Sequence, residues 1–384
     1  MFKNYFKTAW RNLRKNRLSS SINIVGLGLA VGCCLVMFVF INWQINQDDF
    51  QIKRNKIYVV ERIESKDGNQ QLWANSPAPI GPMLKIDYPQ IENYARLNLM
   101  DATIKQGDNV FNEPVSFVDS SFYDMFNFPV KWGNKKTFRD PEGIVLSEEL
   151  SEKLFGKENP VGKNVFANFN ATGKEEAGNF IVKGVFEKRP AESSFYFSAL
   201  IPFSKLAALG INTNDDWERH VSITFLEATT ESSTLPNTAQ SKKYVDLYNA
   251  ANKENKIAGY NLQPLKSMPF HSYKVNLSQF HSTNIIGNIM LSAIALSILI
   301  LVCFNYMNIA IASASGRLKE IGVRKVLGSN RKQIIFYFLI ENFILCMIGV
   351  ILGVLLANFL FIPWFSQFAN INLSQNLFLN TSIW

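Results

Sequence analysis

The stretch from Ser21 to Trp43, SINIVGLGLAVGCCLVMFVFINW, decides the fold because it contains no charged residue. The hydrocarbon core of a bilayer is about 30 Å thick, and roughly 20 apolar residues in an α-helix cross it. A core helix of a soluble protein rarely runs this far without a polar stripe. A cleaved signal peptide is disfavoured, since the small-x-small motif Ala30-Val-Gly32 falls inside the apolar run rather than after it. We therefore predict a retained transmembrane helix over residues 19–43.

Two later stretches have the same character. Residues 285–313 carry no charge, and residues 334–365 carry Glu341 alone. They predict a second span over 284–314 and a third over 334–365. A carboxylate inside a span costs a few kcal/mol unless it is paired or faces other helices. Two interpretations of Glu341 stay open: an inward-facing side chain with a hydroxyl or amide partner, and a side chain that reaches the inner interface.

Glycines recur four residues apart in two of these spans. Gly28 and Gly32 lie in the first span, and Gly349 and Gly353 lie in the third. Where side chains are absent, helix backbones approach closely, and this close packing drives helix association in lipid. The glycine pairs therefore predict a packed helical bundle.

The basic residues predict how the chain is oriented. Residues 1–17 carry six lysines and arginines and no acid, and the loop 315–332 carries six against Glu320 alone. Cytoplasmic loops hold the excess of Lys and Arg, so both segments are predicted inside and residues 44–283 outside. The net charge of +8 thus follows from membrane topology and indicates no nucleic-acid partner.

Residues 1–18 are predicted to form an amphipathic helix. One face is basic, and apolar residues recur at helical spacing on the other, namely Phe2, Tyr5, Phe6, Ala9, Trp10 and Leu13. Such a helix lies in the headgroup plane against anionic lipid. A docking helix for a cytoplasmic partner is the alternative.

The outside segment, 44–283, is predicted to be an α+β domain. Short runs of β-branched and aromatic residues alternate there with helical patterns and clusters of turn residues. All the cysteines lie in the predicted spans: Cys33, Cys34, Cys303 and Cys346. The outer domain therefore relies on no disulfide.

We find no enzyme signature in the sequence. Residues 156–164, GKENPVGKN, imitate a phosphate loop, but five residues rather than four separate the glycines and Asn164 replaces the required hydroxyl. We predict a turn between a helix and a strand there. His220, His271 and His281 are not at metal-ligand spacing, and no nucleophile elbow is present. The sequence thus predicts no catalytic, cofactor or metal site.

The inner loop, 315–333, belongs to the most informative stretch of the chain. Residues 314–341 read ASGRLKEIGVRKVLGSNRKQIIFYFLIE. Apolar residues share faces of a short helix, Gly322 permits close backbone approach, and Gly328 is a helix stop. Two interpretations follow from the residues alone, a helix that pushes on a partner and a simple connector that obeys the positive-inside rule.

The run from Lys319 to Ser329, KEIGVRKVLGS, resembles the cytoplasmic signature of MacB/FtsX-type ABC transporter permeases. Other stretches are also similar to that family: WRNLRK at 10–15, IVGL at 24–27, SPAP at 76–79, FVDSSFYDMF at 117–126, VLSEELSEKLFG at 145–156 and NPVGK at 159–163. The resemblance covers nearly the whole chain, and the cytoplasmic run is its most specific part.

The resemblance implies two protein partners in the membrane system. An ABC ATPase subunit binds the inner loop and holds the ATP, so the chain itself carries no cofactor, and a second permease unit pairs with it as a homo- or heterodimer. The resemblance assigns ATPase coupling to residues of the inner loop: Glu320, Ile321, Gly322, Arg324, Lys325, Leu327 and Gly328.

The resemblance also implies the architecture, a membrane α-helical bundle with a large extracytoplasmic α+β domain. A porter-like part would cover 50–100 and 200–275, and a sabre-like insert would cover 101–199. Family members have four spans, whereas three are seen here before a tail at 366–384. The fourth span is therefore expected to be missing, as in the N-terminal part of a longer tandem permease.

The function implied is that of a multi-pass permease in the bacterial inner membrane. It would export or extract an envelope substrate such as a peptide, antibiotic or lipoprotein, with an envelope adaptor as a further partner. The alternative is a membrane-anchored sensor or regulator of cell-envelope enzymes, which needs a cytoplasmic signalling module that the short inner loop does not provide. An envelope hydrolase would need a nucleophile constellation, and none is found.

Overall fold

A computed structural model describes residues 17–66, 68–170, 175–190, 192–208, 214–229, 240–280, 285–326, 328, 330–369, 371 and 373. The chain divides into two compact units, Met1–Ile45 with Ile285–Trp384, and Asn46–Asn284. Most of the amphipathic helix predicted over 1–18 lies outside the described residues. We call the two parts the membrane unit and the outer domain.

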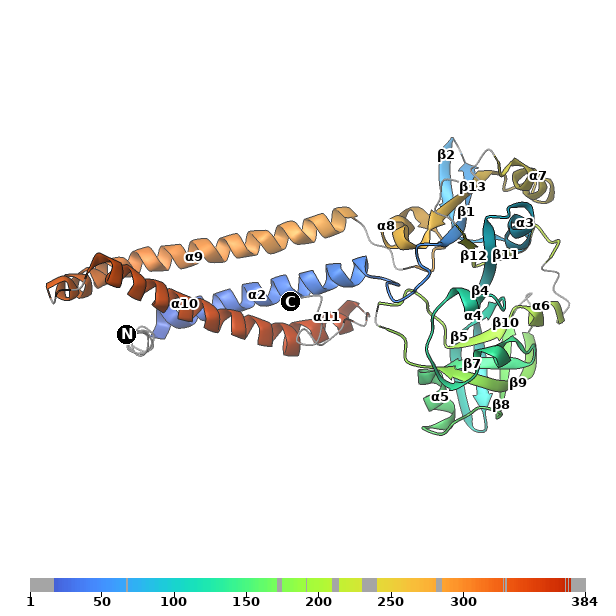
Figure 1. The fold of residues 1–384 in the computed structure, drawn as a ribbon, viewed down its shortest axis with the longest axis horizontal. Coiled ribbons are helices and arrows are strands. Elements are labelled where there is room, and N and C mark those ends of the chain that lie inside the picture. Colours follow the sequence, from blue (N-terminus) through green and yellow to red (C-terminus); the bar gives the residue numbers. More distant parts are fainter. Residues whose placement is uncertain are drawn as a thin grey trace. The chain divides into compact units, whose positions relative to one another are not determined.

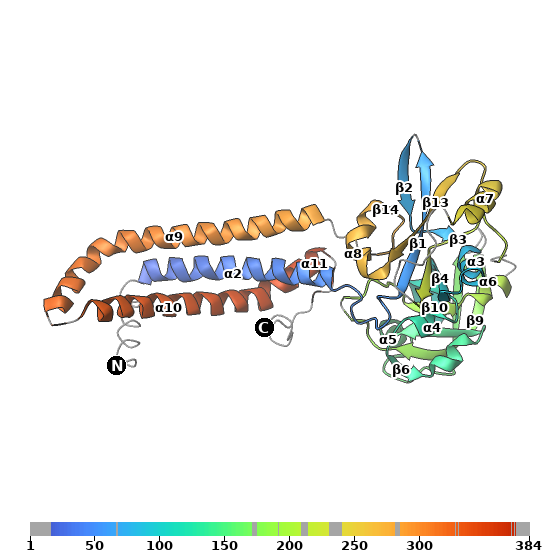
Figure 2. The ribbon, with the colours of Figure 1, turned by 45° about the horizontal axis from the view of Figure 1, so that its top comes forward.

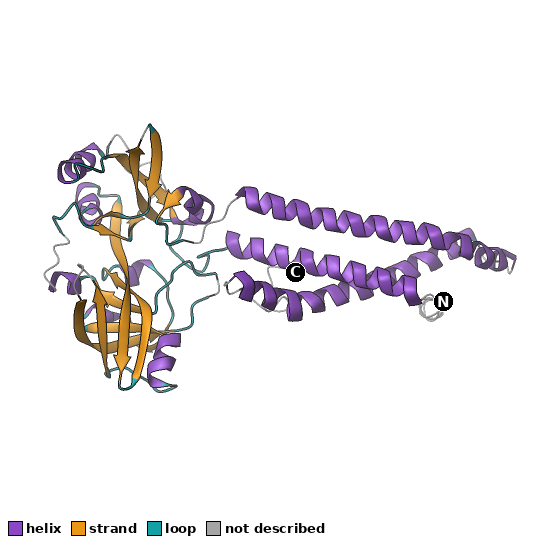
Figure 3. Cartoon of the chain, turned by 180° about the vertical axis from the view of Figure 1, so that it is seen from behind, coloured by secondary structure: helices purple, strands orange, loops and turns teal. Residues whose placement is uncertain are grey.

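The membrane unit is entirely helical in its described part (Figures 1 and 3). Its elements are α2 (Arg17–Ile45), α9 (Ile285–Val326), α10 (Arg331–Leu356), a π-helical turn η5 (Ala357–Phe361) and α11 (Ile362–Ala369). Three stretches are long and apolar enough to cross a membrane: Ser20–Ile45, Ile285–Asn308 and Arg331–Ala369. That the fourth span of the family is missing from this chain stays a prediction.

The structure differs from the separate elements predicted for 284–314 and 315–333, because α9 runs without a break through most of both (Figure 2). Residues 317–320 are Arg, Leu, Lys and Glu, which all favour a helix, so nothing in the sequence ends α9 where the apolar stretch ends. Gly328 follows the helix with φ +86°, a conformation that favours glycine. The helix stop predicted at Gly328 is confirmed, but the helix that it ends is the second span itself.

The four predicted glycines meet where α2 packs against α10. A Cβ placed on Gly353 would lie 2.8 Å from the Gly28 carbonyl oxygen, and one on Gly349 would lie 2.8 Å from Leu27 Cδ2. A Cβ on Gly32 would lie 2.8 Å from Phe361 Cε2. The two backbones thus approach closely because these positions carry no side chain.

The outer domain contains a mostly antiparallel 12-stranded sheet (Figure 3). Its path is β14-β2-β1-β12-β4-β5-β10-β7-β9-β6, with β13 beside β1 and β8 beside both β4 and β9. The strands are β1 (Ile57–Lys66), β2 (Asn69–Trp73), β4 (Ile91–Gln106), β5 (Asn109–Val118), β6 (Val130–Gly133), β7 (Gly143–Ser147), β8 (Asn164–Asn170), β9 (Glu175–Phe186), β10 (Ala199–Pro202), β12 (Ile223–Ala228), β13 (Ile257–Pro264) and β14 (Val275–Asn276).

Short elements complete the described part of the outer domain. The helices are α3 (Ile80–Asp87), α4 (Phe122–Met125), α5 (Glu148–Phe155), α6 (Ser204–Ala208), α7 (Lys242–Ala251) and α8 (Met268–His271). The 3₁₀ turns are η1 (Lys135–Arg139), η3 (Leu265–Ser267) and η4 (Ser272–Lys274), and β3 (Ser76–Pro77) pairs with β11 (His220–Val221). The turn predicted in place of a phosphate loop is confirmed, because residues 156–163 join α5 to β8.

A phenylalanine-rich core joins the two parts predicted for the outer domain. Phe126, in the predicted insert, packs 4.8 Å from Phe195 and 4.9 Å from Phe225, measured between ring centroids. The strand β4 also runs across the predicted boundary at residue 100. The porter-like and sabre-like division stays a prediction, but the two parts share one sheet and one core cluster.

The glycine contact predicts a sharp difference between two otherwise similar substitutions. Gly353→Ala should lower the stability of the membrane unit by about 1–3 kcal/mol, because the added methyl overlaps the α2 backbone. Gly26→Ala is the matched control in α2, since a Cβ there meets nothing within 4 Å. Thermal unfolding of the full chain in detergent, followed by tryptophan fluorescence, measures both. Equal stability of the two variants would contradict the packing argument.

Candidate functional site

The first candidate region is the end of α9 and the turn after it. Gly322 and Lys325 are exposed, and Ile321 is half-buried. A Cβ placed on Gly322 would meet nothing within 4 Å, so packing within the described chain does not require a glycine there. The exposed Val323 and Val326 are three residues apart and share a helix face.

The remaining coupling residues are only partly described. Glu320 and Arg324 lie within α9, but their side chains are not described, and Leu327 lies outside the described residues. The Gly328 N–H donates to the Lys325 carbonyl oxygen at 3.1 Å and so closes the last turn. At the start of α10 the Asn330 N–H donates to Gln333 Oε1 at 3.0 Å. The sequence places the coupling residues together, and the structure places the described ones at one end of one helix.

Glu341 lies inside the helices of the membrane unit, with 3 % of its surface exposed. It is in α10, one turn after the buried Tyr337 and close in sequence to the buried Ile344 and Leu345. Its position in the helix is therefore inward-facing. The role of its carboxylate stays a prediction.

The segment that directly follows α2 binds two loops of the outer domain. The Ser194 N–H donates to Asp48 Oδ1 at 3.0 Å, and the Ser194 hydroxyl donates to Asp48 Oδ2. The Asp48 N–H donates to the Glu192 carbonyl oxygen at 2.9 Å. The Asn127 N–H donates to Gln51 Oε1 at 2.6 Å. We call these contacts the Asp48 latch.

The Asp48 side chain is buried, and its backbone has a left-handed conformation that few residue types adopt. Asp48 is 3 % exposed and has φ +58°, a left-handed conformation in which Asp and Asn are enriched. Burial raises the pKa of the Asp48 carboxyl from its ordinary 3.8 to about 6, although the two Ser194 hydrogen bonds act in the opposite direction. Pattern reading missed this site, since its partners are far apart in the chain, and its one local signal is an acid just after an apolar span.

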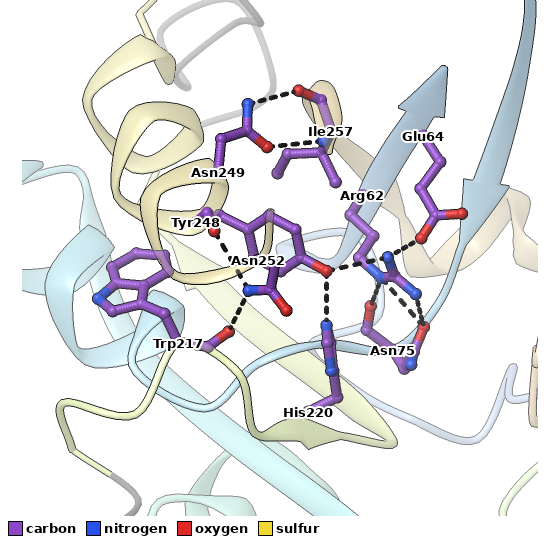
Figure 4. Close-up of polar contacts among 9 residues, drawn as sticks. All are labelled: Arg62, Glu64, Asn75, Trp217, His220, Tyr248, Asn249, Asn252 and Ile257. Carbon is purple, nitrogen blue, oxygen red and sulfur yellow. Dashed lines mark hydrogen bonds and ion pairs between the residues drawn. The ribbon is translucent and has the colours of Figure 1, made fainter. Parts of the chain in front are cut away.

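A cluster of hydrogen-bonded polar side chains surrounds Arg62 in the outer domain (Figure 4). Arg62 Nε donates to the Asn75 carbonyl oxygen at 3.0 Å, and its Nη1 donates to Tyr248 Oη at 3.3 Å. His220 Nε2 lies 3.0 Å from the same hydroxyl. The cluster ties α7 to β1 and β11, and its members are hydrogen-bonded to one another rather than facing an open site.

The histidines fit structural roles. Burial, and then the positive charge of Arg62, lowers the pKa of His220 to about 4, so its ring is neutral at physiological pH. His271 Nε2 lies 3.0 Å from Glu61 Oε2, and His281 lies outside the described residues. Across the described part of the chain, no group of three His, Cys, Asp or Glu residues could hold a metal ion.

Two family models match the chain, and together they cover both units. The model of the MacB-like periplasmic core domain matches residues 20–242, and that of the FtsX-like permease C-terminal region matches residues 292–383. The chain belongs to the MacB/FtsX-type permease family. These matches confirm the family that the cytoplasmic and periplasmic motifs resemble, and with it a membrane protein that carries a large MacB-like extracytoplasmic domain.

Several curated relatives of this family member are ABC permeases. The ABC transporter permease YvrN of Bacillus subtilis (strain 168) is 24 % identical over 91 % of this chain and 85 % of its own length. The pyoverdine export ATP-binding/permease protein PvdT of Pseudomonas syringae pv. syringae (strain B728a) is 22 % identical over 91 % of this chain and 50 % of its own. The macrolide export ATP-binding/permease protein MacB of Aggregatibacter actinomycetemcomitans is 26 % identical over 62 % and 34 %. The chain thus spans half or less of the last two relatives.

Solved structures of outer domains are also similar. A domain of a permease protein from Porphyromonas gingivalis is 17 % identical, with a TM-score of 0.43, over 56 % of this chain and 91 % of that one. The extracellular domain of the ABC-type transporter YknZ from Gram-positive bacteria is 17 % identical, with a TM-score of 0.37, over 54 % and 99 %.

The raised pKa of Asp48 predicts a pH dependence that Asp48→Asn removes. Because the folded pKa lies above the unfolded value, the carboxyl stabilises the fold most below about pH 4, and this stability is lost as pH rises through about 6. Asn tolerates the left-handed backbone and carries no charge. The stability of wild type relative to Asp48→Asn should therefore fall by roughly 2 kcal/mol between pH 4 and pH 7, since one pKa unit is about 1.4 kcal/mol.

Thermal unfolding of the full chain in detergent across this pH range measures the difference. Asp49→Asn is the matched control, because the Asp49 side chain is 55 % exposed beside the same turn. A wild-type-minus-Asp48→Asn difference that stays flat with pH would show that Asp48 is not a buried acid with a raised pKa.

Proposed function

We propose that this chain is the permease subunit of an ABC transporter that transmits ATP-driven movement across the inner membrane to its outer domain. The observation that carries the proposal is the length of α9. Its 42 residues extend about 63 Å at 1.5 Å per residue, roughly twice the hydrocarbon thickness of a bilayer. A single helix can therefore reach from the outer side of the bilayer to a partner beyond its inner surface.

The partner that fits the inner end of α9 is a separate ATPase subunit. The open surface around Gly322 and the exposed Val323 and Val326 offer a small apolar area on a basic element. Burying one such side chain is worth roughly 1.5–3 kcal/mol. Glu320, Arg324 and the other coupling residues complete this surface, and the chain itself holds neither the ATP nor a catalytic group.

Movement of α9 can reach the outer domain directly, because the domain ends at Asn284 and α9 begins at Ile285, and it can also reach the domain through α10 and α2. α9 leads through the turn at Gly328 into α10, and α10 meets α2 at the glycine contact. α2 leads directly into the Asp48 latch, which holds Asn127 and Ser194 of the proposed sabre-like insert, 101–199. A displacement of α2 along its own axis therefore acts on that insert, and β4 and the phenylalanine core carry it into the porter-like part, 50–100 and 200–275.

Two permease units and lipid complete the assembly. No described residue of α9 over its candidate span is buried, which supports contacts with lipid and with a second permease unit in a dimer. The substrate is an envelope compound such as a peptide, antibiotic or lipoprotein, handed to an envelope adaptor or released outside. The names of the relatives MacB and PvdT, which refer to macrolide and pyoverdine export, support export as the direction of transport.

Substitutions at the end of α9 should uncouple the ATPase without unfolding the permease. Gly322→Trp and Leu327→Asp should both abolish transport and the permease-dependent stimulation of the partner's ATPase. A Cβ at position 322 meets nothing within 4 Å, so the Trp side chain starts from an open surface and is expected to act on the partner. Asp at position 327 replaces an apolar docking side chain with a charge. Lys325→Arg, which keeps the positive charge, is the control and should behave as wild type.

The measurement is ATP hydrolysis by a partner ABC ATPase, reconstituted with each variant in lipid nanodiscs. Circular dichroism melting shows whether each permease variant is folded. Full stimulation by both Gly322→Trp and Leu327→Asp would leave the turn as a connector and overturn the proposed coupling.

A further inference from the structure

An open hollow of about 460 Å³ lies at the tip of the β4–β5 hairpin and is lined also by residues of β8 and β9. Ligand sites in proteins typically measure about 300–1,000 Å³. Its lining residues are Lys105, Gln106, Gly107, Asn164, Phe166 and Asn179. None of them belongs to the Asp48 latch or to the coupling surface at the end of α9.

The sheet register aligns the central three side chains of this hollow. Lys105 in β4 lies opposite Phe166 in β8, and Phe166 lies opposite Asn179 in β9. Residues opposite one another across antiparallel strands point to the same face of the sheet. The alternate positions of the same strands, such as Ile104 and Ala167, are buried on the other face. The row is therefore held by three paired strands with a packed core behind them.

The lining is chemically unusual for a solvated surface. The Phe166 side chain is 39 % exposed, although an aromatic ring is normally buried. The polar side chains of Lys105, Gln106, Asn164 and Asn179 make no hydrogen bond or ion pair with the described part of the chain. No carboxylate belongs to the described lining. The hollow thus presents one ring, three amides and one ammonium with unused hydrogen-bonding capacity.

This set of groups matches a carbohydrate. Each amide both donates and accepts hydrogen bonds, as sugar hydroxyls and acetamido groups require. An exposed ring offers an apolar face on which the C–H face of a pyranose stacks. A lone ammonium without a neighbouring carboxylate favours an anionic group on the ligand. We propose that this hollow binds a glycan of N-acetylated amino sugars that carries a carboxylate, as the glycan of a bacterial cell wall does.

Glycan binding goes beyond the proposed transport function and needs neither ATP nor the ATPase partner. Bound to wall glycan through the hairpin tip, the outer domain would be anchored through residues that are not part of the Asp48 latch. The two proposals fail separately, because the coupling assay reads ATP hydrolysis and the glycan assay reads ligand binding to the permease alone.

Saturation-transfer NMR on the full chain tests the proposal, in a detergent whose headgroup is not a sugar. The probes are the disaccharide of N-acetylglucosamine and N-acetylmuramic acid, the uncharged N,N′-diacetylchitobiose, and inorganic phosphate. Wild type should bind both disaccharides, with the acidic one tighter, and phosphate should displace neither. Phe166→Ala should weaken both about tenfold, which corresponds to about 1.4 kcal/mol.

Lys105→Gln should remove the preference for the acidic disaccharide while leaving the neutral one unchanged. Tyr273→Ala, which removes another exposed ring of the outer domain, is the matched control and should bind as wild type. Absence of wild-type binding at millimolar disaccharide would overturn the proposal. So would equal binding by Phe166→Ala and Tyr273→Ala, or displacement of the acidic disaccharide by phosphate, which would indicate a simple anion site.

Discussion

The close approach of α2 to α10 is the contact on which the rest of the account depends. In lipid, backbone polar groups must be hydrogen-bonded within the segment, so the spans are helices, and those helices associate by packing rather than by release of water. The Gly28 carbonyl oxygen lies only 2.8 Å from where a Cβ on Gly353 would be, so a larger residue there must push the two helices apart. Because α2 leads directly into the outer domain, this contact joins the segment that enters the domain to α10.

The two proposed parts of the outer domain share one sheet and one core, so we expect them to move together. Its longest strand, β4, belongs to both of the proposed parts, and the phenylalanine cluster packs across the same boundary. The chain enters this body through Asp48, whose buried carboxylate costs stability above about pH 6. A neutral residue of the same shape avoids that cost, yet the acid holds Ser194 by two charge-assisted hydrogen bonds. Stability is thereby exchanged for fixed contacts between the first residues of the outer domain and its loop at residues 192–194.

Sequence reasoning succeeded where the cause is local. The three apolar stretches, the Gly328 stop and the turn at 156–163 follow from composition and from single residues whose chemistry permits few conformations. Sequence reasoning failed where a feature depends on residues far apart in the chain, or on a helix that continues beyond its apolar stretch. Asp48 and Ser194 are separated by 146 positions, so no periodicity connects them. The continuation of α9 beyond its apolar part was missed because hydropathy reports the membrane boundary, whereas helix propensity decides where the helix ends. The row formed by Lys105, Phe166 and Asn179 likewise requires the strand register, which a sequence alone does not specify.

The central claim is that ATP-driven change at the inner end of α9 moves the outer domain. The most direct test is a distance measurement between two paired permeases, each with a single spin label at residue 161 in the outer domain. The native cysteines are all free and lie in the membrane unit, so they can be replaced beforehand. With the ATPase partner in nanodiscs, double electron–electron resonance should give different distance distributions in the nucleotide-free and ATP-bound states. Identical distributions in the two states, in a complex that hydrolyses ATP, would contradict the account.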